Sequence, residues 1–335
     1  MKAIVLRKIG GPENLCLEEV ETPKPKANEV VVQLKYASLN RRDLFITQGL
    51  YPKIMLPCIL GSDGAGEVIA IGGEVKGLQM GSEVIINPAM NWGPDDTKTS
   101  PDYHTLGMPK NGTFSQYIVV SEEDLFPKPE YLSWEEAAAL PLAGVTAFSA
   151  AVIKGDVKEG ETVLIPGIGG GVAQYALQIA VAKGANVYVT SGNEEKLARA
   201  KQLGAIDGVN YRSSDWVKQL RSKMGGADLI IDGVGGASFH DFIYLTKQGG
   251  RIVTYGATNG PVDQFVLPRI FFKNMDIRGA MMGSPRHFLL MLKFFDNYKI
   301  RPVIDRSFPL ECATEALLHV NKGANFGKIT LEIPQ

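Results

Sequence analysis

Four glycines fall in one short turn between an apolar segment and an amphipathic segment. They are Gly167, Gly169, Gly170 and Gly171. Residues 162–165 before the turn are strand-like, and a helical pattern runs from Val172 to about Lys183. Small residues let the backbone approach a pyrophosphate, and the amide groups and positive end of the following helix can hold it. A glycine run alone is weak, but this context predicts a dinucleotide-binding turn made by the four glycines and Val172.

The end of the next strand indicates which dinucleotide is bound. An acidic side chain there accepts the ribose 2′-hydroxyl of NAD, whereas hydroxyl donors and a cation suit the 2′-phosphate of NADP. The chain reads TSGN at residues 190–193, and Lys196 follows. We therefore predict NADP(H), with Ser191 and Lys196 as contacts. Glu194 and Glu195 leave NAD open, because either could accept the ribose hydroxyls.

These residues need a parallel sheet to position them, and the second half of the chain has the matching alternation of strands and helices. Predicted elements follow one another at 162–165, 172–183, 187–190, 194–203, 229–231 and 251–255. Such alternation is typical of right-handed βαβ units. A helix before them begins with Ser133 and Glu136 in capping-box spacing.

The first 121 residues differ, with β-branched or glycine-punctuated segments at 29–36, 61–71 and 82–87 that indicate a β-rich domain. A polar stretch over residues 87–116 predicts a long surface lobe. The end of the chain has a helical segment at 285–297 and strand-like segments at 302–308 and 328–333. We expect it to return to the first domain, which makes two domains in all.

Composition limits the classes of function. Apolar residues make up 45% of the 335 residues, charged residues 21%, and the formal net charge is −1, so nothing indicates a basic surface for nucleic acid or membranes. The longest uncharged run, 137–153, contains Pro141 and is interpreted as a buried helix. Cys16, Cys58 and Cys312 are too scattered for a disulfide framework or a zinc finger, and we expect a soluble cytoplasmic protein.

Several motifs, taken in order, resemble one known superfamily. They are YASLNRRDLFITQGLYP, LPCILGSDGAGEVIAIG, LPLAGVTAFSA, GIGGGVAQYALQIA and DLIIDGVGG. The chain resembles the medium-chain dehydrogenase/reductase superfamily nearly end to end, and most of all its quinone oxidoreductase branch, which reduces quinones and α,β-unsaturated carbonyls with NADPH. The resemblance implies an α/β fold. A GroES-like β-rich catalytic domain would comprise 1–124 and 267–335, and a Rossmann domain with a doubly wound parallel sheet would comprise 125–266.

Zinc-dependent alcohol dehydrogenases of that superfamily differ from this chain at the metal site. They have a cysteine where this chain has Asn40, and a GHE triplet where it has Gly61, Ser62 and Asp63. Because zinc needs three protein donors, we predict no metal. The lobe resembles one that holds a structural zinc with four cysteines in those relatives, yet it contains none. His104 is the one unexpected potential ligand in the lobe, and an exposed loop histidine is the simpler interpretation.

The missing metal also favours a substrate class. Zinc stabilises an alkoxide, so simple alcohols become poor substrates without it. Quinones and enones spread the negative charge of the reduced form by conjugation, so a positioned hydride donor and hydrogen-bond donors can suffice. We predict an NADPH-dependent, metal-free reductase of a quinone or an α,β-unsaturated carbonyl. The alternatives are a zinc-type alcohol dehydrogenase and a nucleotide-binding sensor with little turnover.

The resemblance implies three catalytic residues in the LNRRDL and GLYP motifs. Tyr51 would donate a hydrogen bond to the developing oxyanion, Asn40 would orient the carbonyl, and Asp43 would position its neighbours. Arg41 and Arg42 are interpreted as solvated, or one of them as a contact of a cofactor phosphate.

Further cofactor contacts implied by the resemblance are Thr146, Tyr211, Asn325 and Lys328. Tyr255 and Gly256 are added because they follow a predicted strand, and open α/β sheets bind ligands at the carboxyl ends of their strands. Thr146 is expected near the nicotinamide and Tyr211 near the adenine ribose phosphate, although each position also has an ordinary turn or strand interpretation. The expected partner is a small-molecule substrate, with no nucleic acid and no membrane. By analogy, a homodimer would form by sheet extension through KNMDIRGAMMG, residues 273–283.

Overall fold

The computed structural model describes residues 1–335, which form two compact units. Unit 1 comprises Met1–Ala143 and Gly283–Gln335, and unit 2 comprises Gly144–Met282. These boundaries lie later in the chain than those predicted after residues 124 and 266. Two elements account for the difference. Helix α2 (Trp134–Ala139) packs on strands of the unit 1 sheet, and strand β16 (Asp276–Gly279) pairs in the unit 2 sheet.

Unit 2 contains a six-stranded sheet in the order β13-β12-β11-β14-β15-β16, and every pair in it is parallel. Besides β16, its strands are β11 (Thr162–Ile165), β12 (Asn186–Ser191), β13 (Asp207–Asn210), β14 (Ala227–Asp232) and β15 (Thr246–Thr254). This is the doubly wound order of a Rossmann domain. The predicted parallel sheet is confirmed.

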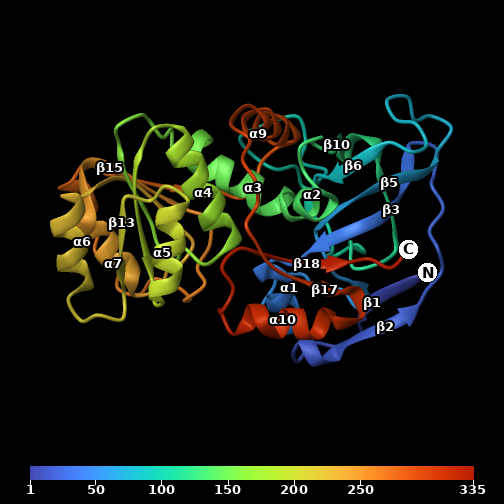
Figure 1. Cartoon of the computed structure of the whole chain (residues 1–335), viewed down its shortest axis with the longest axis horizontal. Helices are drawn as coiled ribbons and strands as arrows, with labels where there is room; N and C mark the ends of the chain where they lie inside the picture. The colour runs from blue at the N-terminus through green and yellow to red at the C-terminus, as the bar shows by residue number, and fades with distance from the viewer. The chain divides into compact units, whose positions relative to one another are not determined.

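Helices connect the strands of unit 2 in chain order (Figure 1). They are α4 (Gly171–Ala182), α5 (Glu194–Gln202), α6 (Trp216–Met224), α7 (Ser238–Leu245) and the short α8 (Pro268–Phe271). Leu220 of α6 and Phe242 of α7 belong to one buried apolar cluster with Ile230 of the sheet. Helices α4 and α5 contact β11, β12 and β13 instead. The middle of the sheet is thereby buried, which explains why its central strands β11 (TVLI) and β14 (ADLIID) are mainly apolar.

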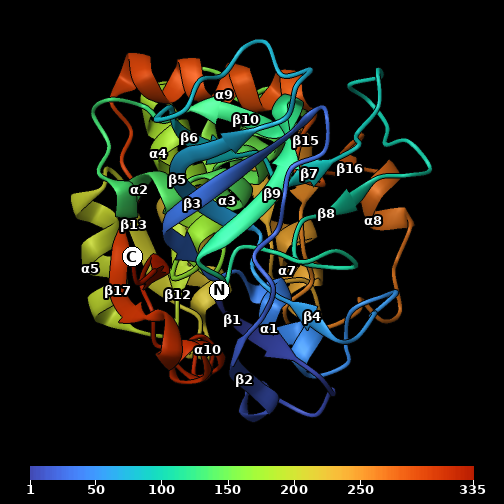
Figure 2. The same cartoon turned by 90° about the vertical axis from the view of Figure 1, so that its right-hand side faces the viewer.

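Unit 1 contains the β-rich sheet predicted for the start of the chain. Its strands pair in the order β10-β6-β5-β3-β18-β17, and β9 also pairs with β3. Figure 2 shows β6, β5, β3 and β9 of this sheet side by side. They are β3 (Glu29–Ser38), β5 (Asp63–Ile71), β6 (Glu83–Ile86), β9 (Tyr117–Ser121), β10 (Leu125–Pro127), β17 (Ile304–Pro309) and β18 (Lys328–Glu332). Because β18 pairs with β3, the end of the chain lies in the same sheet as strands from its first 127 residues.

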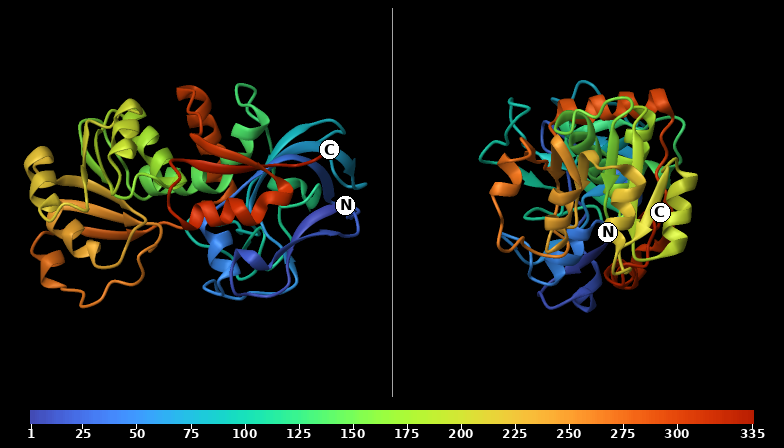
Figure 3. Two further views of the ribbon diagram at one scale, coloured as in Figure 1. Left: turned by 60° about the horizontal axis from the view of Figure 1, so that its bottom comes forward. Right: turned by 90° about the vertical axis from the view of Figure 1, so that its left-hand side faces the viewer.

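Two smaller sheets and three further helices complete unit 1. The sheets are β2-β1-β4, formed by β1 (Lys2–Leu6), β2 (Leu15–Glu19) and β4 (Cys58–Ile59), and the pair β7 (Ala89–Met90) and β8 (His104–Thr105). The helices are α1 (Arg41–Thr47), α9 (Pro285–Tyr298) and α10 (Ala313–Asn321). Helix α10 contacts α1, so the two ends of the chain meet in this unit (Figure 3, left).

The uncharged run 137–153 is buried in large part, but the prediction of one helix there is wrong. Helix α2 ends at Ala139, α3 (Pro141–Phe148) begins at the proline, and a π-helical turn (Ser149–Ile153) follows. Proline lacks the N–H that a continuing helix would need, and it is tolerated in the first turn of a new one. None of the helices has the length and apolar character needed to cross a membrane.

The polar lobe of residues 87–116 has a small core of its own. Trp92 is buried and meets the ring of Tyr103 edge-on, with 5.4 Å between ring centroids. Trp92 Nε1 donates to the Asp95 carbonyl at 3.0 Å, and the Asp96 carboxylate accepts a hydrogen bond from Ser284 Oγ at 2.5 Å. Aromatic packing and hydrogen bonds therefore hold this cysteine-free lobe in unit 1.

Candidate active site

A buried ion pair lies where three strands of the unit 1 sheet meet. Asp63 begins β5, Lys328 begins β18, and Ser38 at the end of β3 pairs with Asp63 in the ladder. The Lys328 ammonium lies 3.0 Å from Asp63 Oδ2, and the two side chains are 4% and 0% exposed. Because such a pair is stable only when its remaining donors and acceptors are satisfied, the surrounding contacts decide its character.

Those contacts are complete. Lys328 Nζ also donates to the Leu39 carbonyl and to Asn40 Oδ1, each at 2.8 Å. Asp63 accepts from Ser38 Oγ and Asn40 Nδ2 on one oxygen and from the Leu142 N–H on the other. An ammonium has three donors, so Lys328 has none left for a phosphate. The prediction that Lys328 contacts the cofactor is untested, but in unit 1 its ammonium orients Asn40.

Asp43, in the first turn of α1, supports the same segment. Its Oδ2 accepts the Asn40 backbone N–H at 2.8 Å, while its Oδ1 is buried without a partner. Burial raises the pKa of Asp43 to about 6, opposed by the nearby charge of Arg42. The structure therefore brings Asn40, Asp43 and Lys328 together, although only the first two were predicted to act at one place.

Arg42 is not solvated, which corrects the interpretation of this residue. Its side chain is 8% exposed, and its Nη1 donates to Ser62 Oγ at 2.5 Å and to the Leu106 carbonyl at 2.7 Å. Its guanidinium carbon lies 4.9 Å from the centre of the Tyr51 ring. Tyr51, the third predicted catalytic residue, is half-buried, and its hydroxyl lies 3.5 Å from Arg42 Nε.

Sequence reasoning missed the roles of Ser38, Arg42 and Asp63. Ser62 and Asp63 stood inside a motif used for the resemblance, but as positions of lost metal ligands rather than as partners of other residues. Asn325, predicted to contact the cofactor, donates from Nδ2 to the Gly327 carbonyl at 2.9 Å, in the turn that leads into β18.

In unit 2, the glycine turn leaves the end of β11 and is tied to the end of β12. Gly167 has a φ of 65°, a left-handed conformation that favours glycine, and its N–H donates to Thr190 Oγ1 at 3.3 Å. The Ile168 N–H donates to the Thr190 carbonyl at 3.0 Å. A Cβ added at Gly170 would meet nothing within 4 Å, so the approach to the start of α4 is open.

A polar group surrounds Gly192, just after β12. A Cβ added there would lie 2.8 Å from Tyr211 Oη and 2.9 Å from Arg212 Nε. The predicted contacts Ser191 and Tyr211 thus belong to one neighbourhood, and Arg212 is an addition that was not predicted. Glu194, the acidic alternative, accepts a hydrogen bond from Asn210 Nδ2 at 2.8 Å.

The remaining predicted cofactor residues of unit 2 are spread over it. Lys196 lies in the first turn of α5, where Asn193 Oδ1 caps its backbone N–H. Tyr255 and Gly256 follow β15, and the Tyr255 ring covers Gly233 closely enough that a Cβ there would clash at 2.4 Å. Burial raises the pKa of Tyr255, as does the neighbouring Asp232. Thr146 is buried in α3.

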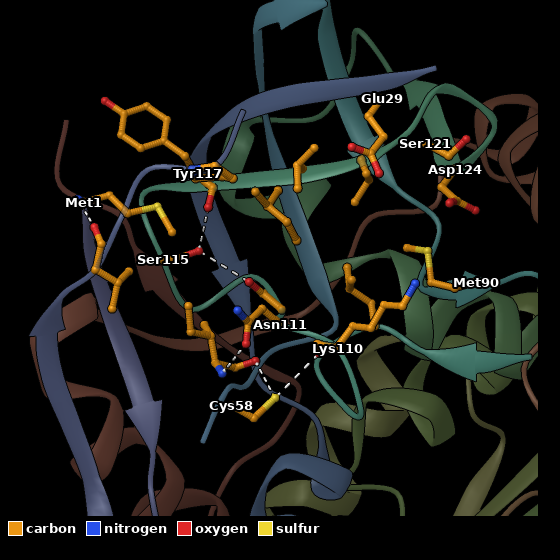
Figure 4. A pocket seen from close by; sticks show the side chains of 18 of the residues that line it. Met1, Glu29, Cys58, Met90, Lys110, Asn111, Ser115, Tyr117, Ser121 and Asp124 are labelled. Atoms are coloured by element: carbon orange, nitrogen blue, oxygen red, sulfur yellow. Dashed lines mark hydrogen bonds between the residues drawn. The ribbon is translucent and has the colours of Figure 1, made fainter. Parts of the chain in front are cut away.

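Unit 1 also has a cavity of about 860 Å³ that none of the three predicted catalytic residues lines (Figure 4). Lys110 and Asn111 lie on its wall, and the Cys58 thiol contacts the Lys110 carbonyl at 3.6 Å. Asp124 also lines it, and burial raises the pKa of this carboxyl to about 7. The cavity is thus separate from the site formed by Asn40, Asp63 and Lys328.

Comparison with known proteins identifies the relatives of the chain. Residues 26–130 match the alcohol dehydrogenase GroES-like domain, and residues 171–297 match the zinc-binding dehydrogenase family. The zinc-type alcohol dehydrogenase-like protein YogA of Leptosphaeria maculans is 39% identical, covering 95% of this chain and 94% of the relative. The quinone oxidoreductase of Sus scrofa is 30% identical, covering 99% and 97%. A crystal structure of an NAD-dependent alcohol dehydrogenase aligns with a TM-score of 0.95 and 39% identity over the whole of both chains.

The residues present do not fit the zinc that these names imply. No three His, Cys, Asp or Glu side chains gather in a group that could hold a metal ion. Asn40 Nδ2 and Ser62 Oγ, at two positions of expected ligands, already bond to Asp63 and to the Leu106 carbonyl. The folds of the two units, the ordered motifs and the relatives nevertheless all indicate the same superfamily. The chain belongs to the medium-chain dehydrogenase/reductase superfamily, in its quinone oxidoreductase-like branch, and is an oxidoreductase of a family that binds nicotinamide cofactors.

Proposed function

We propose that this protein is an NADPH-dependent reductase of quinones or other conjugated carbonyl compounds, and that it works without a metal ion. The observation that carries the proposal is the buried Lys328–Asp63 pair with Asn40 between its charges. Asn40 holds the position of a zinc-ligating cysteine in the metal-dependent relatives. An ammonium 2.8 Å from its side chain leaves a second cation there strongly disfavoured.

A site without a Lewis acid suits substrates that carry their own means of charge delocalisation. Bound NADPH would supply a hydride, and the chain's residues would bind the carbonyl and stabilise the oxygen that becomes negative. Asn40 is held on both ends of its amide by Lys328 and Asp63, so its orientation is determined. Tyr51 accepts a weak contact from Arg42, which leaves its own O–H hydrogen free to donate to the substrate.

One relative is named as NAD-dependent, so the names of relatives do not favour NADPH. The proposal of NADPH depends instead on residues of unit 2. Ser191 and the exposed Tyr211 and Arg212 surround Gly192, where a 2′-phosphate would sit after β12. A guanidinium and hydroxyl groups suit a phosphate dianion. Glu194 already accepts a hydrogen bond from Asn210 Nδ2, which disfavours it as an acceptor for the ribose hydroxyls of NAD. The open backbone at Gly170 suits a pyrophosphate.

The test is to follow NADPH oxidation by chelator-treated protein with a quinone and, separately, with a conjugated enone. NADH and a simple alcohol with NADP serve as controls. We expect turnover with NADPH after chelation and weak turnover with NADH. Activity that appears only with an alcohol and added zinc would overturn the proposal, and nucleotide binding without turnover by any acceptor would favour a sensor.

The three free cysteines support action in a reducing cytoplasm.

We also propose that the active form is a homodimer joined along β16, the edge strand of the unit 2 sheet. Apolar side chains are exposed on and around this edge, among them Phe271, Phe272, Ile277 and Met281. A long unprotected apolar edge is a surface that proteins normally cover. Light scattering should give twice the chain mass of 36.3 kDa, and Ile277→Lys should shift it toward the monomer. A monomer mass for the wild type would contradict this assembly.

A further inference from the structure

The two buried cations of unit 1 differ in how well they are paired. Lys328 forms an ion pair with Asp63 and has all its donors engaged. Arg42 is buried almost as deeply, yet it forms no ion pair with any carboxylate, and the charge of Asp43 acts on it only through space. A buried charge without an opposite charge destabilises the folded state. We therefore expect Arg42 to have a role in function.

The hydrogen bonds of Arg42 all fall on one side of its guanidinium. Nη1 is fully used by Ser62 Oγ and the Leu106 carbonyl. Nη2 is buried and has no partner, and Nε has only a long contact of 3.5 Å to Tyr51 Oη. The edge formed by Nε and Nη2 is therefore buried and lacks a strong hydrogen-bond acceptor. That edge presents two parallel N–H donors, the geometry that arginine uses to bind an anionic oxygen group.

Tyr51 is the cover over this edge. Its ring lies over the guanidinium, with 4.9 Å between the guanidinium carbon and the ring centre, and it is half-buried against the apolar core of unit 1, so a substrate oxygen reaches Nη2 only if the ring shifts. The Ser62 hydroxyl and the Leu106 carbonyl fix the other side of the guanidinium, so the group stays in position when Tyr51 moves. The arrangement is a buried cation that hydrogen bonds hold on one side and an aromatic ring covers on the other.

We infer that the Nε–Nη2 edge of Arg42 binds the carbonyl oxygen of the substrate, so that Arg42 is a catalytic residue where relatives use a metal. This inference rests on the proposed reductase function. Bound NADPH would supply the hydride and become NADP⁺, so that a carbon–hydrogen bond of the cofactor breaks, one forms at the conjugated carbon of the substrate, and the π electrons move onto the oxygen. Arg42 stabilises that oxyanion, and a proton from solvent then completes the reduced product. Two donors on a developing charge are worth most in a site shielded from water.

The experiment compares Arg42→Met, Arg42→Lys and the wild type. Arg7→Met is the matched control, because Arg7 is an exposed arginine of the same unit that pairs with Glu18. With a quinone and saturating NADPH, we expect kcat to fall ~100-fold or more in Arg42→Met, less in Arg42→Lys, and not at all in Arg7→Met. NADPH affinity should stay unchanged in all three. A kcat within twofold of the wild type in Arg42→Met would overturn the inference.

A second readout does not need turnover. 4-Nitrophenolate carries a delocalised oxyanion like that of a reduced quinone, and its absorbance reports its ionisation when it binds. We expect the wild type to bind the ionised form and Arg42→Met to lose this binding; equal binding by both would count against Arg42. If Arg42→Met fails to fold, as judged by its thermal midpoint, Arg42→Lys decides, since it keeps the charge but not the two-donor edge. Binding through Arg42 without reductase activity in the wild type would refute the proposed function and leave the anion site standing.

Discussion

The two units build their candidate sites from different materials. Unit 1 uses buried charged side chains, with Lys328 against Asp63 and Arg42 close by. Unit 2 uses backbone, in a turn whose glycines leave space at the start of a helix. Buried charges make a site sensitive to any change of charge, because low-dielectric surroundings amplify each one. A backbone site instead tolerates changes of charge but not an added Cβ, and the following variants test this contrast.

The largest effect is expected from Asp63→Leu. This change removes the only carboxylate paired with Lys328 and leaves the ammonium buried at 4% exposure. Removing one partner of a buried pair costs about 3–5 kcal/mol. We expect the free energy of unfolding, measured in urea, to fall by that amount at pH 7.

The double variant Asp63→Leu with Lys328→Met is its companion, because it removes both charges. It should regain much of the lost stability, as a buried pair can often be replaced by apolar side chains. Glu18→Gln, which breaks the exposed pair with Arg7, should leave the midpoint unchanged. A double variant as unstable as the single one would show that the charge itself is not the cause.

The next effect is a dependence of stability on pH that comes from Asp43. Its pKa in the folded protein is about 6, above the ordinary value of 3.8, so the folded state binds the proton more tightly. The resulting stabilisation is complete below about pH 4 and is lost as the pH rises through 6. Asn cannot titrate, so between pH 4.5 and 7.5 the wild type should lose about 2 kcal/mol relative to Asp43→Asn. Urea unfolding of both proteins at the two pH values measures it, and a constant difference would contradict the assignment.

The glycine turn should respond in the opposite manner, to shape and not to charge. Gly167→Ala places a Cβ on a left-handed residue and 3.1 Å from Val234 Cγ2, so we expect a loss of about 1–2 kcal/mol in unfolding free energy. Gly170→Ala is the matched variant, because its Cβ meets nothing within 4 Å. It should keep the stability of the wild type yet bind NADPH ~10-fold more weakly, since a pyrophosphate needs that space. Unchanged NADPH affinity in a titration would move the pyrophosphate away from Gly170.

The same contrast explains which parts of the structure could be predicted. The turn and its flanking elements carry local signals, so β11 was predicted with its observed ends and Ser133 and Glu136 do form the capping box. The Lys328–Asp63 contact joins residues 265 positions apart. No local sequence pattern predicts such a pair, because the pair forms only when β18 and β5 both lie beside β3.

Average tendencies of residue types gave two wrong predictions, for the exposure of Arg42 and for the helix over residues 137–153. Arginine is mostly exposed in proteins, and nothing near Arg42 in the sequence marks the Leu106 carbonyl and Ser62 hydroxyl that receive it in the fold. The run 137–153 looked like one helix by composition, although Pro141 within it was visible. Proline is typical of the first turn of a new helix, and Pro141 does begin α3 in the structure.

The smallest effect concerns the cofactor's 2′-phosphate and joins the two kinds of site, since Arg212 brings a charged side chain to the backbone-built unit. Arg212 is exposed and its Nε lies near Gly192, so Arg212→Ala should raise the KM for NADPH ~10-fold, the equivalent of about 1.4 kcal/mol. NADH lacks the phosphate, so its KM should not change. Lys218→Ala removes an exposed cation from α6 and should alter neither value. Equal losses for NADPH and NADH would mean that Arg212 supports the fold of this region and does not read the phosphate.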